Sequence, residues 1–238
     1  MADKEFMDLR GGPGEHGPPA LPSNSPPHPP SGGWGREVGR GGRGLQPLAP
    51  SPNTLLATLP LAPGRAALVW GEQLRYVAAA AAAWGVGRGV QVLVVDAANR
   101  FDPYALVRQA RRRGLSPQTA LCRVQVARAF TCHQLVRLLE KELAPRLLPG
   151  SLVVVLGPVS LFYDEQVPLP ERRRLFQEVV RHLAAVKSRQ ALLLLQPLLP
   201  QGVANHHFGK MLAPLMDYLV RMEEIAGRQG ARGVVPGE

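Results

Sequence analysis

The sequence predicts an α/β fold: a doubly wound, mainly parallel sheet with helices on both faces. Two observations support this prediction. Short apolar runs alternate with longer segments of helical periodicity along residues 54–226, and short turns join them. The central runs also lack the alternation of apolar and polar residues that marks a half-exposed strand, as expected when helices cover both faces of the sheet.

Five segments are expected to be strands, because each is short, apolar and bounded by turn residues. They are residues 65–70, 90–95, 122–127, 152–156 and 191–195. The second and fourth of these are rich in valine, which favours a strand buried in the middle of the sheet.

The first two helices are placed by residues typical of helix ends. Residues 73–84 are rich in alanine and are followed by Gly85, a residue favoured just after a helix. Asp102 and Pro103 supply an N-cap and a first-turn proline for a helix that ends at Arg113. Both segments therefore follow an expected strand directly, as in a βαβ unit.

Three more helices are expected in the second half of the chain. Thr131 and Gln134 have the spacing of a capping box, which predicts a helix up to Leu143. Residues 170–188 show an apolar face of helical period, and residues 210–225 are expected to form the last helix.

Composition divides the chain into three parts. Residues 1–53 are dominated by Gly and Pro and are expected to be disordered, residues 54–226 form one α/β domain, and residues 227–238 form a flexible tail. Within the first part, Arg36, Arg40 and Arg43 stand among glycines, a pattern that suits contact with nucleic acid. A plain solvated linker explains this short pattern equally well.

The chain is strongly basic, with 28 Lys and Arg against 18 Asp and Glu and a formal charge of +10. An anionic polymer such as nucleic acid is a reasonable partner, although a GC-rich genome also raises the arginine content.

Two cysteines make neither a disulfide framework nor a zinc site, which favours a reduced compartment. No apolar run spans a membrane and no export signal is evident, so the expected location is cytoplasmic, at the nucleoid in a bacterium.

Three segments resemble the ATPase core of the RecA/RadA recombinase family, both in their residues and in their order along the chain. They are residues 96–103 (Asp-Ala-Ala-Asn-Arg-Phe-Asp-Pro), residues 113–117 (Arg-Gly-Leu-Ser-Pro) and residues 126–130 (Val-Ala-Arg-Ala-Phe). The resemblance covers roughly residues 54–225 and is most specific between residues 90 and 130. It implies a RecA-like fold and a role in DNA repair or recombination.

Three parts of the ATPase that the resemblance implies are missing. The turn after the first strand, residues 71–76, has one glycine and no Gly-Lys-Thr, so no phosphate loop is expected. The catalytic glutamate of the family falls on Ala98, and the aspartate that holds Mg²⁺ falls on Gly157. We therefore expect a pseudo-ATPase without catalytic residues, cofactor or metal.

The resemblance also bears on the end of the fifth strand and the loop after it. Gln196 stands where the family senses the γ-phosphate, but without a nucleotide a strand-end hydrogen bond is the favoured role. The following loop contacts DNA in the family, and here His206, His207 and Lys210 are the candidate nucleic-acid contacts. Adjacent histidines in an extended loop point apart, so metal binding by this pair is not expected.

Two further features are weighed against structural roles. Arg172, Arg173 and Arg174 lie in the first turn of a helix, where the helix dipole disfavours cations, so they are candidate contacts to an anionic partner. A solvated surface explains each arginine individually. Cys132 and His133 are neighbours on a helix and are expected to face different directions, which argues against a nucleophile pair.

The function expected from these features is that of a non-catalytic accessory protein in DNA repair or recombination. It would bind DNA, single-stranded in the main, or a partner recombinase or polymerase. The alternative is a non-catalytic subunit of a shared ATPase, which supplies an arginine or a docking surface to a catalytic partner. A purely structural assembly protein is a third possibility. An oligomer is compatible with all three.

Overall fold

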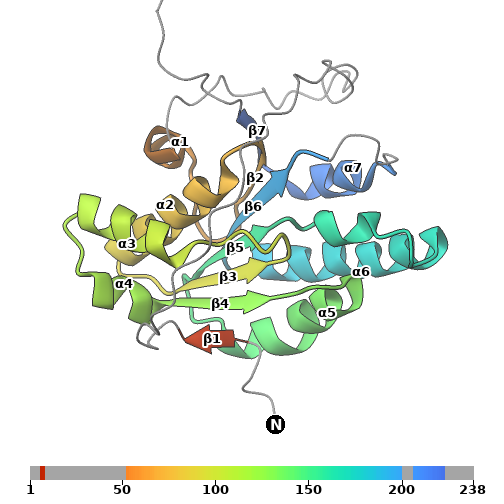
Figure 1. Ribbon diagram of the computed structural model, residues 1–238, viewed down its shortest axis with the longest axis horizontal. Coiled ribbons are helices and arrows are strands. Elements are labelled where there is room, and N and C mark those ends of the chain that lie inside the picture. The colour runs from red at the N-terminus through yellow and green to blue at the C-terminus, as the bar shows by residue number, and fades with distance from the viewer. Residues whose placement is uncertain (1–5, 9–51, 200–205, 223–238) are drawn as a thin grey trace, which may run out of the picture.

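A computed structural model describes residues 6–8, 52–199 and 206–222, and it shows an α/β fold built on one sheet (Figure 1). Six strands run parallel: β2 (Ala66–Gly71), β3 (Val92–Asp96), β4 (Val124–Arg128), β5 (Leu152–Leu156), β6 (Ala191–Pro197) and β7 (Tyr218–Met222). The order across the sheet is β1-β4-β3-β5-β6-β2-β7. The edge strand β1 (Phe6–Asp8) pairs antiparallel with β4.

Helices cover both faces of the sheet, as the sequence predicts (Figure 1). One face carries α1 (Pro52–Thr58), α2 (Leu74–Gly87), α3 (Pro103–Arg112) and α4 (Pro117–Arg123). The other face carries α5 (Cys132–Arg137), the π-helix η1 (Leu138–Leu143), α6 (Leu169–Lys187) and α7 (Phe208–Leu212). Short 3-10 turns are η2 (Ala144–Arg146), η3 (Ser160–Tyr163) and η4 (Ala213–Leu215). Of the helices described, none is long and apolar enough to cross a membrane.

Small side chains set the distance between α2 and the sheet. The alanines of residues 78–83 are all fully buried, between the sheet and the neighbouring helices α1 and α3. Gly85 lies so close to β3 that a Cβ there would come within 2.7 Å of the Val92 side chain. The alanine run that predicts this helix therefore also explains its close packing, because larger residues would push α2 away from the sheet.

The structure corrects two of the strands and helices expected between residues 54 and 226. The strand expected over residues 122–127 is shorter, because Ser116 caps an additional helix, α4, through its hydroxyl, which accepts a hydrogen bond from Thr119 N at 3.1 Å. The helix expected over residues 210–225 ends early at Leu212, and residues 218–222 form β7 instead.

The physical reason for the second correction is local. Pro214 cannot continue a helix, and after it Val220 and Met222 are buried while Arg221 between them is exposed. This alternation has the period of a strand, which pairs in parallel with β2.

Residues 1–53 were expected to be disordered, but residues 6–8 form β1 and α1 begins at Pro52. Residues 1–5 and 9–51, the tail at 227–238, and the arginines Arg36, Arg40 and Arg43 lie outside the described residues.

A carboxylate fixes the start of the edge strand β7 to the strand beside it. Asp217 accepts a hydrogen bond from Ala66 N at 2.9 Å and contacts Lys187 Nζ at 2.8 Å and an Arg65 guanidinium nitrogen at 3.5 Å. Burial acts to raise the pKa of Asp217, but the hydrogen bonds from Lys187 and Ala66 and the charges of Lys187 and Arg65 outweigh it. The net result is a pKa below the ordinary value.

This pKa predicts a pH-dependent contribution to stability. A carboxyl with a lowered folded-state pKa stabilises the fold above its unfolded-state pKa of about 4 and loses this contribution as the pH falls through the folded-state pKa. Asp217→Asn is expected to lower the free energy of unfolding at pH 7 by about 1–3 kcal/mol, and by less as the solution is acidified. Urea unfolding at several pH values measures the difference. Glu165→Gln, at an exposed carboxylate, is the control, and an effect of Asp217→Asn that does not change with pH would contradict the prediction.

Candidate functional site

The candidate site lies at the carboxyl end of the parallel strands, where α/β proteins commonly bind ligands. A cleft of about 680 Å³ opens there. It is lined by residues that follow three different strands: residues 71–76 after β2, residues 99–102 after β3, and Pro197 and Leu198 at the end of β6. Residues 71–76 stand where the resemblance implies a phosphate loop. They therefore lie beside residues 99–102, which belong to the segment most similar to the recombinase family.

The turn after β2 has a strained but compact geometry. Gly71 has φ of 137°, and a Cβ at this residue would overlap the Met222 carbonyl of β7, so only glycine fits. Gln73 has φ of 55°, which is uncommon for a residue with a side chain. Arg75 donates a hydrogen bond to the Tyr76 hydroxyl at 2.7 Å and covers its ring at 4.6 Å. Residues held in rare conformations gather at functional sites, and Asn99, with φ of 51°, lines the same cleft.

Asp96 organises the turn after β3. Its carboxylate is fully buried and accepts hydrogen bonds from Arg100 N at 3.0 Å and Phe101 N at 2.9 Å. Arg128, at the end of the neighbouring strand β4, places Nε 3.4 Å from the same carboxylate and donates from a terminal nitrogen to the Phe101 carbonyl at 3.3 Å. The Asp96 carbonyl also accepts from Ala129 N at 3.2 Å. The Asp96 side chain thus joins the ends of β3 and β4 and fixes the loop that follows β3.

The two positions at which the resemblance implies carboxylates lie against each other. Gly157 follows β5 with φ of 66°, and a Cβ there would come within 2.6 Å of the Ala98 Cβ and 2.7 Å of the Ser160 hydroxyl. The turn is further fixed by the hydrogen bond from Gly157 N to the Leu195 carbonyl at 2.7 Å. A longer side chain at residue 157 therefore requires its surroundings to move.

Gln196 has the structural role that the sequence favours. Its Oε1 accepts a hydrogen bond from Val159 N at 2.9 Å, and its Nε2 donates to the Pro197 carbonyl at 2.9 Å. Nε2 also lies 3.4 Å from the Ser160 hydroxyl. The side chain is buried and ties the end of β6 to the turn after β5.

Exposed aromatic and arginine side chains stand on the segments that follow β3 and β4. Tyr104 is 74% exposed and Phe130 is 62% exposed, although large apolar side chains are mostly buried elsewhere in the described residues. Arg100, Arg108 and Arg128 are exposed on the same two loops and on the first turns of α3. We call these five residues the aromatic–arginine surface. Figure 1 shows β3 and β4, which lead into it, side by side.

Two of the three arginines at the start of α6 remain on the surface. Arg173 is exposed, and Arg174 is exposed and paired with Glu178 at 2.8 Å. Arg172 is only 5% exposed and donates to the Phe162 carbonyl at 3.1 Å. This placement corrects the expectation for Arg172, whose guanidinium supports the fold instead of facing a partner.

The candidate residues after β6 lie at the same end of the sheet. His206 stacks on Tyr163 with ring centroids 6.3 Å apart, and burial raises the pKa of Tyr163 to about 12. His207 has φ of 59° and is exposed, and Lys210 is exposed on α7. Of these three residues, His207 and Lys210 are exposed and His206 is half-buried.

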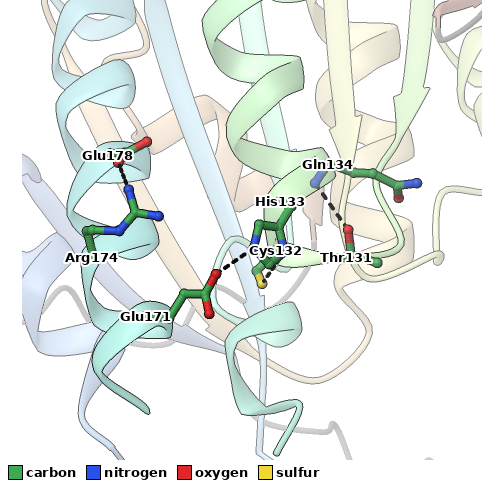
Figure 2. A network of polar contacts seen from close by, with 7 residues as sticks. All are labelled: Thr131, Cys132, His133, Gln134, Glu171, Arg174 and Glu178. Carbon is green, nitrogen blue, oxygen red and sulfur yellow. Dashed lines mark hydrogen bonds and ion pairs between the residues drawn. The ribbon is translucent and has the colours of Figure 1, made fainter. Parts of the chain in front are cut away.

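Cys132 and His133 do not point apart as the sequence analysis expects. Figure 2 shows the Cys132 sulfur facing the His133 ring and the ring facing Glu171. The distances are 3.6 Å from Sγ to Nδ1 and 3.0 Å from Nε2 to the Glu171 carboxylate. The thiol is buried, and this burial raises its pKa, which disfavours the reactive thiolate. Thr131 caps the helix as expected, accepting from Gln134 N at 3.1 Å.

No protein-family model matches this chain. The candidate site therefore rests on its own geometry. Sequence reasoning did not name Tyr104, Phe130, Arg100 or Arg128 as candidate contacts, although the last three lie inside the segments that carry the resemblance. One sequence signal was available. Phe130 comes just after a strand and Tyr104 just after a helix cap, and an aromatic side chain at such a position is not expected to be buried.

The Asp96 contacts predict that replacing this aspartate by asparagine lowers the stability of the fold. Asp96→Asn removes the charge that faces Arg128 and one of two strong acceptors, and is expected to lower the free energy of unfolding by about 1–3 kcal/mol. Asp102→Asn is the control in the same loop, because asparagine caps a helix about as well as aspartate. Urea unfolding of the full chain measures both. Equal effects of the two variants would contradict the central role of Asp96.

The Gly157 contact predicts a difference between two glycines of similar conformation. Gly157→Ala and Gly150→Ala both place a side chain at a positive φ, 66° and 76°. Gly150 has nothing within 4 Å, whereas Gly157 faces Ala98. Gly157→Ala is expected to cost about 1–3 kcal/mol more than Gly150→Ala because of overpacking. Thermal or urea unfolding measures both, and similar losses would show that the turn opens easily.

Proposed function

We propose that the chain is a non-catalytic relative of the RecA/RadA recombinases that acts as an accessory protein in DNA repair and recombination. It binds single-stranded DNA, and it docks on a recombinase or polymerase partner. In a bacterium this places it in the cytoplasm, at the nucleoid. The observation that carries the proposal is the aromatic–arginine surface at the carboxyl end of β3 and β4.

The chemistry of this surface suits a single strand better than a duplex. Exposed aromatic rings such as Tyr104 and Phe130 stack on unpaired bases, and guanidinium groups pair with the phosphates between them. Arg100 is exposed, and no described residue makes a hydrogen bond or an ion pair with its side chain. Arg108 and Arg128 keep exposed side chains while each contacts one aspartate.

The preorganisation of the surface gives further support. Asp96 fixes the backbone of Arg100 and Phe101, and Arg128 is held by the same carboxylate. Two of the three segments that resemble the recombinases thus converge on one buried carboxylate. A surface held in place by the fold loses little conformational entropy when it binds a partner.

The contact between Ala98 and Gly157 supports the non-catalytic part of the proposal. In this fold the two residues occupy neighbouring turns at the carboxyl ends of β3 and β5, where the resemblance places the two carboxylates of an ATPase. The chain instead has a methyl group and a glycine there, packed in contact. Mutual packing of this kind is what a structural turn needs, and it is compatible with a binding role for this edge.

A second candidate function is favoured by one observation. Arg75 and Arg100 come from different turns and both line the cleft at the carboxyl end of the sheet. In a shared ATPase, such arginines could stabilise charge on a nucleotide held by a catalytic partner. Arg172 is buried, so Arg173 and Arg174 are the arginines at the start of α6 that remain exposed for this role.

The first function predicts a specific pattern of binding. A labelled single-stranded oligonucleotide, followed by anisotropy across a salt series, is expected to bind the full chain with a steep dependence on salt. Tyr104→Ala and Phe130→Ala are expected to weaken binding by about 1–3 kcal/mol each without changing the salt slope, because they remove stacking. Arg100→Ala is expected to reduce the slope by about 0.7, because one phosphate contact is lost.

Two control variants assign the binding to this surface. Leu148→Ala removes an exposed apolar side chain at the other end of the sheet and is expected to have no effect. Replacing Arg36, Arg40 and Arg43 together by alanine measures the share carried by the N-terminal segment. No binding at low salt would overturn the role in DNA binding. The second candidate would then be favoured if a recombinase-type subunit co-purifies and hydrolyses ATP faster when this chain is present.

A further inference from the structure

The helices α2, α3 and α4 carry arginines but no acidic residue. Residues 103–139 contain seven arginines and no aspartate or glutamate, and residues 73–95 contain two arginines and no acid. The three helices pack beside one another on one face of the sheet (Figure 1). The nearest acids in sequence, Glu72, Asp96 and Asp102, all lie at the carboxyl end of the strands. On these helices positive charge is therefore not balanced by negative charge.

The ends of the three helices bring their arginines together. Arg123, the last residue of α4, donates a hydrogen bond to the Gly89 carbonyl at 2.9 Å, in the turn after α2. Arg88 in the same turn lies over the Trp84 ring, with its guanidinium carbon 4.1 Å from the ring centroid. Burial, and next the charge of Arg88, lower the pKa of Arg113, the residue that follows α3. We call Arg88, Arg113 and Arg123 the arginine cluster.

Support of the helix ends accounts for only part of this charge. Helix C-termini favour cations, and α2, α3 and α4 all end here. Arg113 and Arg123 make hydrogen bonds within the fold. Arg88, and Arg111 and Arg112 in the last turn of α3, are exposed and form no hydrogen bond or ion pair with a residue that the structure describes. Their guanidinium groups are free to meet an anionic partner.

The exposed side of α3 connects the arginine cluster with the aromatic–arginine surface. Arg108, Arg111 and Arg112 follow Tyr104 by four, seven and eight residues, a spacing that places all four on one side of a helix. All four are exposed, whereas the opposite side of α3 is buried. Tyr104 and Arg108 belong to the aromatic–arginine surface, and Arg112 adjoins Arg113 of the cluster. The ten residues of α3 thus form a basic stripe about 15 Å long.

We propose that a single strand of DNA bound at the aromatic–arginine surface continues along the exposed side of α3 to the arginine cluster. This inference rests on the proposed function, because it extends the same site. A row of guanidinium groups that begins at an exposed ring matches the phosphates and bases of a single strand. An acidic peptide offers the charge but no bases to stack on Tyr104, so it matches the stripe less completely.

The length of the bound strand tests this path. The full chain is titrated with thymidine oligonucleotides of about 4 and about 12 nucleotides, within the range that a single binding domain covers. Anisotropy is followed across a salt series. The longer strand is expected to bind more tightly and with a steeper salt slope, because it reaches phosphate contacts beyond the aromatic–arginine surface. Each such contact adds about 0.7 to the slope.

Two sets of substitutions assign the additional slope to α3 and the cluster. Arg111→Gln combined with Arg112→Gln is expected to lower the slope of the longer strand by about 1.4 and to leave that of the short strand unchanged. Arg88→Gln is an independent variant with an expected loss of about 0.7. The matched control, Lys141→Gln combined with Arg181→Gln, removes two exposed charges from helices of the opposite face and is expected to change neither slope.

The outcomes separate the path from the proposed function. If the short strand binds but the longer strand gains no slope, the path is overturned and the proposed function stands. If neither strand binds at low salt, both fail. Equal losses with the α3 variant and the matched control would show that only overall charge matters, which also overturns the path. Polyglutamate that displaces the longer strand as well as an oligonucleotide of equal charge would assign the stripe to an acidic protein partner instead.

Discussion

The buried carboxylate of Asp96 is the contact on which the carboxyl end of the sheet depends. Loops that follow parallel strands have no hydrogen-bonding ladder of their own, so their backbone groups need other partners. Asp96 satisfies two N–H groups of its own loop and pairs with Arg128 of the next strand. The loop after β3 and the end of β4 therefore behave as one unit. The exposed side chains around them owe their positions to a group that never reaches solvent.

The two ends of the sheet have different chemistry for a reason that follows from the topology. In a parallel sheet every strand ends at the same edge, so the turns that begin α2, α3, α5 and α6 all gather there. Helix N-termini favour negative charge, and exposed arginines at the same edge add to this preference. At the other end the helices finish, and a cavity between η1 and α6 is lined by apolar residues such as Leu147 and Pro149 together with one carboxylate and one guanidinium, Glu140 and Arg189. Negative charge is therefore favoured at the first end, and opposite charges are balanced in the cavity at the second.

Much of the fold could be predicted from the sequence, because its strands and caps have strong local signals. The strand at Leu152–Leu156 has the expected bounds, and Asp102 and Thr131 cap the helices assigned to them. The strand β7 could not be predicted with the same ease. Its five residues, Tyr218–Met222, are short enough to suit a helix or a strand, and their pairing with β2 depends on contacts distant in sequence.

The candidate sites were harder to predict, for two different reasons. Arg172 precedes the buried Phe176 and Val179 by four and seven residues, so helical periodicity places it on the inner face of α6; the cluster of three arginines hid that signal. The contact between the Cys132 and His133 side chains depends on their rotamers, which sequence spacing alone does not determine.

The contact between Ala98 and Gly157 also constrains how this sequence can change. A side chain at residue 157 needs space that the Ala98 methyl group now occupies, so it becomes acceptable only after residue 98 or the turn around it has altered. The effect of one substitution therefore depends on whether another came first. Sequences that descend from this one can reach a carboxylate at residue 157 by some orders of mutation and are blocked along others, and the packing of two small residues sets which routes stay open.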